Sequence, residues 1–140
     1  MATTPKTFPL LHRLLGLALV SLAAVILLLK YLGIAPILRH DSFALVTAYT
    51  LSGFGIVLAA VALFVLKPVV PARLPGQSVE QYWTMPEVGP KAFLVWTVLE
   101  GAGMVAAMGY LITGEFVCAI ATVLAILAYW LCGPSVFAKA

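Results

Sequence analysis

The chain has 140 residues, of which 64% are hydrophobic and 9% are charged, and its formal net charge is +3. A water-soluble domain of this length does not hide so much apolar surface, so the composition excludes an ordinary soluble protein. The eight lysines and arginines are scattered singly, which excludes the basic patch of a nucleic-acid-binding protein. The sequence therefore predicts an integral membrane protein whose main partner is the lipid bilayer.

Four apolar runs are each long enough to cross the hydrocarbon core of a bilayer as a helix, which takes about 20 residues. They cover approximately residues 10–33, 43–66, 93–113 and 116–137. The stretches from Leu22 to Leu29 and from Val117 to Leu127 are almost unbroken in their apolar character and lack the alternation of a membrane β-strand. We expect an all-α membrane protein with four transmembrane helices in an antiparallel bundle, forming a single integral membrane domain over residues 1–140.

The first apolar run begins close to the N-terminus, behind His12 and Arg13, as a signal peptide does. Its apolar stretch is longer than the core of a cleavable signal, and the small-residue site from Ser21 to Ala24 lies inside the run. Cleavage there would leave half a helix. We interpret the segment as a retained membrane span.

Basic residues in short loops favour the cytoplasmic side of a membrane. Six of the eight lie on the side of the two termini and of the loop over residues 67–90, and two lie on the other side. The first group is Lys6, Arg13, Lys67, Arg73, Lys91 and Lys139, and the second is Lys30 and Arg39, with His40, Asp41 and Glu115 nearby. We expect a multi-pass protein of the cell (inner) membrane with both termini cytoplasmic.

The loop over residues 67–90 contains five of the nine prolines, so extended backbone is expected in much of it. Within it, Ser78 and Gln81 have the spacing of a capping box and predict a short helix through Trp83. Tyr82 and Trp83 are then expected at headgroup depth, where amphipathic rings hold the loop against the membrane. The alternative is that they form a docking surface for a partner.

Glu100 is the charged residue that falls deep inside a predicted span. A carboxylate near the bilayer midplane is unfavourable when it is ionised and unpaired, so it must be protonated, hydrogen-bonded or open to a wet cavity. Because no Lys or Arg falls at that depth, hydroxyl groups are the expected partners, and Ser21, Thr50 and Ser52 are the candidates. Glu100 is either a hydrogen-bond donor in helix packing or a proton- or ion-binding site.

Small residues follow Glu100 along the third predicted helix at Gly103 and Ala107, and they recur on the second at Gly55 and Ala59. Small side chains let membrane helices approach closely, where dispersion forces hold them together. The second and third predicted helices are therefore expected to pack against each other.

The remaining reactive residues do not form a recognisable site. His12 and His40 are predicted on opposite sides of the membrane, so no metal site and no other cofactor is expected. Cys118 and Cys132 lie fourteen residues apart on one predicted helix, a rise of roughly 21 Å, so they cannot form a disulfide. The sequence contains no HExxH, Gly-x-Ser-x-Gly or Walker pattern.

Two segments, Trp-Thr-Val-Leu-Glu-Gly-Ala-Gly from Trp96 and Gly-Tyr-Leu-Ile-Thr-Gly from Gly109, resemble small uncharacterised four-helix membrane proteins of bacteria. That resemblance implies a fold and no activity. Glu100 amid small residues, with Gly53 and Gly55 on the preceding helix, is also distantly similar to the proteolipid (c) subunit of rotary ATPases. In that family the carboxylate binds the transported proton or sodium ion, which implies an ion-binding role for Glu100.

The proteolipid likeness covers the second and third predicted helices. It departs from the family in the joining loop, which has 24 proline-rich residues here and is a short polar turn there. Taken together, the sequence predicts a small integral-membrane subunit or accessory protein, not an enzyme, that is a homo-oligomer or part of a larger membrane complex. The alternative is an oligomeric proton- or ion-handling protein that uses Glu100, and an enzyme acting on lipidic substrates is the third.

Overall fold

The computed structural model describes residues 7–38 and 42–139, and within these it contains helices and no strands. The elements are α1 (Thr7–Tyr31), α2 (Ser42–Val61), η1 (Ala62–Leu66), η2 (Lys67–Val69), α3 (Val79–Thr84), α4 (Val88–Thr113), α5 (Phe116–Leu131) and α6 (Pro134–Phe137). The prediction of an all-α chain is confirmed. Lys6, Arg39, His40 and Asp41, which entered the charge count, lie outside the described residues.

Three helical stretches are long and apolar enough to cross a bilayer. They are Thr7–Tyr31, Ser42–Val69 and Val88–Thr113. The fourth predicted span is shorter as a helix, because α5 has 16 residues and ends before Gly133 and Pro134. Length and composition therefore suit a multi-pass membrane protein.

The connection between α2 and α4 contains more helix than its prolines predict. α2 continues through the π-helical turn η1 and the 3₁₀ turn η2, whose Pro68 occupies a first-turn position. α4 begins at Val88, five residues before the predicted boundary, with Pro90 in its first turn. Proline is tolerated there because the first N–H groups of a helix have no acceptor within the helix.

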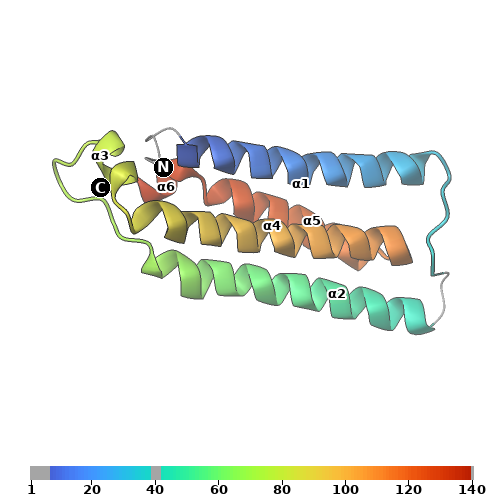
Figure 1. Cartoon of the computed structure of the whole chain (residues 1–140). Helices are drawn as coiled ribbons and strands as arrows, with labels where there is room; N and C mark the ends of the chain where they lie inside the picture. Colours follow the sequence, from blue (N-terminus) through green and yellow to red (C-terminus); the bar gives the residue numbers. More distant parts are fainter. Residues whose placement is uncertain (1–6, 39–41, 140) are drawn as a thin grey trace.

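α4 lies between α1 and α2, and α5 packs along α4 and also touches α1 and α2 (Figure 1). The α1–α2 connection and the α4–α5 turn lie at one end of the molecule, and α3 and α6 lie at the other (Figure 1). The α4–α5 turn is tight because Gly114 adopts a left-handed conformation, with φ of 72°, and its N–H donates to the Tyr110 carbonyl. Glycine tolerates this conformation without strain.

α2 and α4 meet through small residues, as the sequence predicts. A Cβ atom added to Gly55 would lie 2.9 Å from the carbonyl oxygen of Ala102, so the two backbones are in direct contact there. One added to Gly109 would lie 2.9 Å from the sulfur of Cys118 and 3.2 Å from Leu51. Ala59 is half-buried against the core at the α3 end. Dispersion between closely spaced backbones therefore holds α2 against α4.

Gly103 and Ala107 serve a different interface from Gly55 and Ala59. A Cβ atom at Gly103 would lie 2.8 Å from the Leu19 side chain of α1 and 3.4 Å from Ala125 of α5. Ala107 is also buried and lines a small apolar cavity between α1, α4 and α5. α2 therefore approaches α4 closely on one flank, and α1 and α5 approach it on another.

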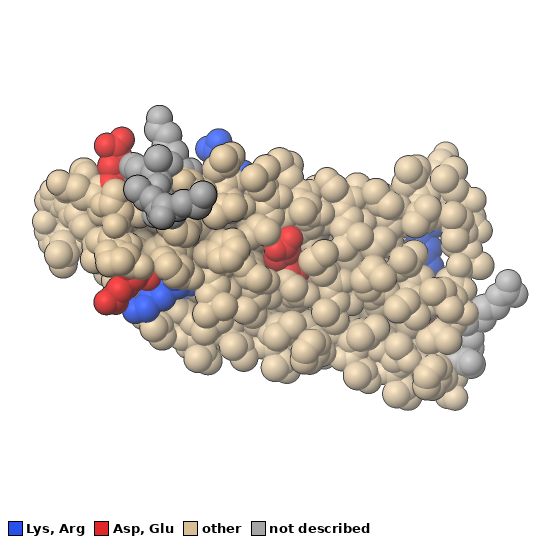
Figure 2. Space-filling view, viewed as in Figure 1, with Lys and Arg blue, Asp and Glu red and all other residues tan. Residues whose placement is uncertain are grey.

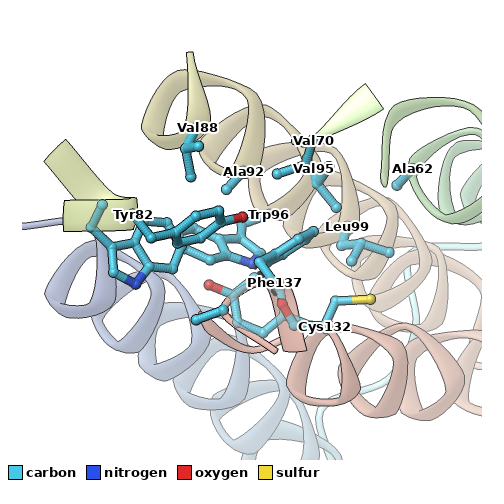
Figure 3. Packing of buried hydrophobic residues seen from close by; sticks show 13 residues of the cluster. Ala62, Val70, Tyr82, Val88, Ala92, Val95, Trp96, Leu99, Cys132 and Phe137 are labelled. Carbon is cyan, nitrogen blue, oxygen red and sulfur yellow. Dashed lines mark hydrogen bonds between the residues drawn. The ribbon is translucent and has the colours of Figure 1, made fainter. Parts of the chain in front are cut away.

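Tyr82 and Trp83 lie inside the protein and not at its lipid-facing surface, which corrects the prediction of a headgroup anchor. The Ser78–Gln81 capping box is present and starts α3 as predicted. Tyr82 is fully buried and Trp83 is 3% exposed, and the Tyr82 hydroxyl donates to the Pro71 carbonyl at 2.8 Å. The Tyr82 ring packs on Trp83, Trp83 on Trp96 and Trp96 on Phe137, and Figure 3 shows this cluster of buried side chains. α3 therefore closes the end of the helix assembly with its own aromatic side chains.

The contact between Gly55 and Ala102 provides a test of the packing. Gly55→Ala is expected to destabilise the detergent-solubilised protein by about 1–3 kcal/mol, because the carbonyl of Ala102 is backbone and cannot move aside. Gly53→Ala on the same helix is the matched control, since nothing lies within 4 Å of its Cβ position. Unfolding by denaturant in mild detergent gives both values. Equal stability of the two variants would contradict the packing of α2 on α4.

Candidate functional site

Glu100 lies near the middle of α4 and is half-buried. Figure 2 shows charged side chains gathered toward the two ends of the visible face and one acidic side chain between them. Within the described residues, Glu100 is the acidic residue in the interior of a long helix. Its depth agrees with the sequence prediction, and its side chain reaches the surface.

The alignment of α1 with α4 shows which residue of α1 lies beside Glu100. The His12 and Trp96 rings lie 4.8 Å apart between centroids, and Leu19 packs on Gly103. Both pairs are separated by the same number of positions in the chain, so α1 and α4 run in parallel register. Glu100 is therefore level with Gly16 of α1, on the flank of α4 that faces α1.

The three predicted hydroxyl partners do not bond to Glu100. Ser21 is exposed on α1 and lies five positions beyond Gly16, about 7 Å further along the axis. Thr50 donates to the Val46 carbonyl of its own helix at 2.8 Å, and Ser52 donates to the sulfur of Cys118 at 3.2 Å. Among the described residues the structure gives Glu100 no hydrogen-bond partner.

Both depth and rotation about the helix axis separate Ser52 from Glu100, since Leu51 packs beside Gly109, nine residues or about 13 Å further along α4. Ser52 faces the flank of α4 that carries Gly109, where Leu51 and Cys118 also pack. Glu100 lies on the other flank, with Gly103 and Ala107. Glu100 is therefore half-buried beside α1, and it interacts electrostatically with the buried Tyr129 of α5.

A cluster of aromatic rings at the α3 end was not predicted from the sequence. His12 is 2% exposed and stacks on Tyr129 at 4.6 Å between centroids with an angle of 12°. The Tyr129 hydroxyl donates to the His12 carbonyl at 2.6 Å, and the Trp96 indole donates to the Cys132 carbonyl at 2.7 Å. No spacing in the sequence signals contacts between residues 117 positions apart.

The same end contains a cavity of about 760 Å³ between α1, α3 and α6. Arg13 and Glu80 line it, together with the buried Trp83 and several apolar residues. Both charged residues are exposed, so their charges stay hydrated. The described residues contain no group of three or more His, Cys, Asp or Glu side chains that could hold a metal ion.

Comparison with models of known protein families, with curated proteins and with solved structures finds no match to this chain. The functional argument therefore stands on the geometry around Glu100 and on the order of charges along the chain.

Tyr82 makes the docking of α3 testable. Tyr82→Phe removes the hydrogen bond to Pro71 and is expected to lower the free energy of unfolding by about 1 kcal/mol. Burial raises the pKa of Tyr82 above its ordinary value of 10.0, so the folded state favours the neutral phenol. Its contribution is therefore complete below the ordinary pKa and is lost as the pH rises past it.

The measurement is the stability difference between wild type and Tyr82→Phe in detergent, from about pH 8 to about pH 11. We expect a constant difference up to about pH 9 that shrinks at higher pH. A difference that stays constant up to about pH 11 would mean that burial does not hold Tyr82 neutral in the folded protein.

Proposed function

We propose that the chain is a small integral-membrane subunit or accessory protein, with four membrane-crossing helices in an antiparallel bundle and both termini on the cytoplasmic side of the cell membrane. α5 makes the fourth crossing in this proposal. Its 16 residues rise about 24 Å, somewhat less than the usual hydrocarbon thickness. Local thinning of the bilayer accommodates such a short span at modest free energy.

The order of charges supports the orientation. Arg13, Lys67, Arg73 and Lys91 belong to the end where α3 lies, and Lys30 belongs to the last turn of α1 at the other end (Figure 1). A bias of basic residues toward one end is the usual signal for the cytoplasmic side.

The proposed subunit role rests on the position of Glu100. Its carboxyl lies at mid-depth, it bonds to no other described residue, and it reaches the surface of the chain. Lipid tails offer no hydrogen-bond donor or acceptor, so a chain surrounded by lipid alone leaves this group unsatisfied. Polar side chains in membrane helices are commonly satisfied across helix–helix interfaces. The geometry therefore favours a protein whose Glu100 flank is covered by another helix.

The topology is tested with reporter insertions. A reporter placed after Gly76, where the chain is exposed and open, is expected to give a cytoplasmic signal, as is one fused after the last residue. A reporter placed after Ala35, in the described part of the α1–α2 connection, is expected to give an external signal. A cytoplasmic signal at Ala35 would reverse the orientation, and signals on opposite sides for Gly76 and the C-terminus would remove the fourth crossing.

The subunit role is tested at Glu100 in native membranes. After gentle detergent extraction, wild type is expected to migrate as an assembly larger than one chain. Glu100→Gln keeps hydrogen-bonding capacity and should preserve that assembly, whereas Glu100→Leu should lose it while keeping the same thermal stability as a single chain. A wild-type chain that migrates alone, or an assembly that is indifferent to Glu100→Leu, would contradict the proposal.

Proton or ion handling is the second candidate, favoured by the surface access of the Glu100 carboxyl. A hydrophobic carbodiimide reacts with protonated carboxyls in apolar surroundings and should label Glu100 faster than the exposed Glu80 and Glu87. An ion-binding role requires that labelling slows with added sodium, or with rising pH between about 5 and 9. Labelling that depends on neither, in cells that tolerate Glu100→Gln, leaves the structural role alone.

A further inference from the structure

The cavity at the α3 end has the size and the wall of a ligand-binding site. It lies between the first turns of α1, α3 and α6, which come together at this end (Figure 1). Its volume of about 760 Å³ is within the usual range for ligand pockets, about 300–1,000 Å³. Its lining is mainly apolar, and it opens to the surroundings because Leu10, Val79 and Ser135 are exposed. The cavity can therefore accept part of a lipid-sized molecule.

Trp83 brings an unpaired hydrogen-bond donor to this cavity. Trp83 is 3% exposed, yet its indole N–H donates to none of the described residues, whereas the Trp96 indole donates to the Cys132 carbonyl. Among the described residues, the side-chain nitrogen that is sealed off without a partner is Nε of Arg73, so the Trp83 nitrogen reaches open space. The open space that Trp83 lines is the cavity. A buried indole favours an acceptor there.

Two opposite charges line the same cavity without pairing. Arg13 of α1 and Glu80 of α3 are both exposed, and among the described residues neither takes part in an ion pair. Lys91 and Glu87, at the same end of the molecule, pair with each other instead. A ligand that suits the cavity therefore carries an anion for Arg13 and a cation for Glu80. A ligand with a single charge would leave one of the two without a counter-ion.

The position of Arg13 on α1 suits a lipid phosphate. α1 has 25 residues and rises roughly 37 Å, which is more than the hydrocarbon thickness of about 30 Å, so its ends reach the headgroups. Arg13 is six positions, or about 9 Å, from the start of α1 at Thr7. An arginine near this boundary extends its guanidinium group toward the headgroups, and it binds phosphate oxygens in a bidentate manner.

The cavity continues into the lipid-facing surface of α1. Leu10 lines the cavity, and Leu14 and Leu17 follow it at spacings of four and three, so the three leucines share one face of the helix. All three are more than half exposed. A molecule whose headgroup occupies the cavity can therefore lay its acyl chains along α1. A free phosphate would make no use of this face, so the arrangement favours a phospholipid.

We propose that this cavity binds the headgroup of a zwitterionic phospholipid with a primary amine, of the phosphatidylethanolamine class. The phosphate accepts from Arg13 and from the Trp83 N–H, and the ammonium group donates to Glu80. A primary ammonium has three N–H donors for a carboxylate, whereas a choline headgroup has none and a glycerol headgroup has no cation. The inference rests on the membrane crossing proposed above, and it depends neither on the orientation nor on the subunit role.

The test is a competition between three phospholipids for the full-length chain. The purified protein in mild detergent receives equal amounts of phosphatidylethanolamine, phosphatidylcholine and phosphatidylglycerol with identical acyl chains, and native mass spectrometry counts the lipids that stay bound. We expect wild type to prefer phosphatidylethanolamine by about fivefold over phosphatidylcholine and by about tenfold over phosphatidylglycerol.

Four variants assign the contacts. Arg13→Gln should weaken the binding of all three lipids by about tenfold, because each carries the phosphate, and Trp83→Phe should weaken all three by about fivefold. Glu80→Gln should bring phosphatidylethanolamine down to the level of phosphatidylcholine. Glu87→Gln is the matched control, since Glu87 is exposed at the same end but does not line the cavity, and it should change nothing.

Thermal melts without added lipid check that each variant folds, which is expected for Arg13→Gln and Glu80→Gln because both side chains are exposed. Equal retention of the three lipids, a preference for phosphatidylglycerol, or the same effect from Glu87→Gln as from Glu80→Gln would overturn the proposal. None of these outcomes touches the reporter or Glu100 experiments. Reversed reporter signals would move the site to the other leaflet, and reporters that show no membrane crossing would contradict the proposed function whichever lipid is retained.

Discussion

The rest of the structure depends on how closely other helices approach the backbone of α4. Gly55 brings α2 against the Ala102 carbonyl, and Gly103 admits Leu19 of α1 between α4 and α5. In a bilayer, lipid tails solvate apolar side chains as well as protein does, so helix association depends on dispersion at short range. Small residues on several flanks of α4 make that short range possible with three neighbours at once. The same arrangement leaves α4 with one uncovered side.

The aromatic cluster solves a different problem, at the end where helices stop. α5 ends at Leu131 before Gly133 and Pro134, which leaves carbonyls without helical donors. The Trp96 indole bonds to one of them, at Cys132, and the Tyr82 hydroxyl bonds to Pro71 in the loop. Ring donors thus satisfy backbone acceptors while their apolar faces pack together. The end of the molecule is closed without a polar core.

The sequence predicted three long apolar helices, because length and apolar composition suffice to indicate them, but it overestimated the length of the fourth, which ends before Gly133 and Pro134. The sequence did not predict which helix packs against each flank of α4. Gly55 and Gly103 are both small residues in similar patterns, yet they lie at contacts between different pairs of helices. Tyr82 and Trp83 were assigned to the headgroup region because an amphipathic ring suits both that region and a protein end rich in backbone carbonyls. The place of Glu100 in the middle of its helix followed from counting residues, but its missing bond to Ser52 depends on how α2 and α4 are aligned along each other and rotated, which small-residue patterns leave open.

The position of Glu100 connects the two functional readings. A carboxyl enclosed between α4 and α5 would have to be satisfied within the chain and would serve stability. A carboxyl at the α3 end would be hydrated and would need no hydrogen-bond partner from another chain. Glu100 is in neither place: it is half-buried near the middle of α4, on the flank that faces α1. Assembly and ion binding would both use a carboxyl that has no hydrogen bond to another described residue of its own chain. They differ in whether the Glu100 proton stays in place or exchanges, and that depends on the access of water to the carboxyl group.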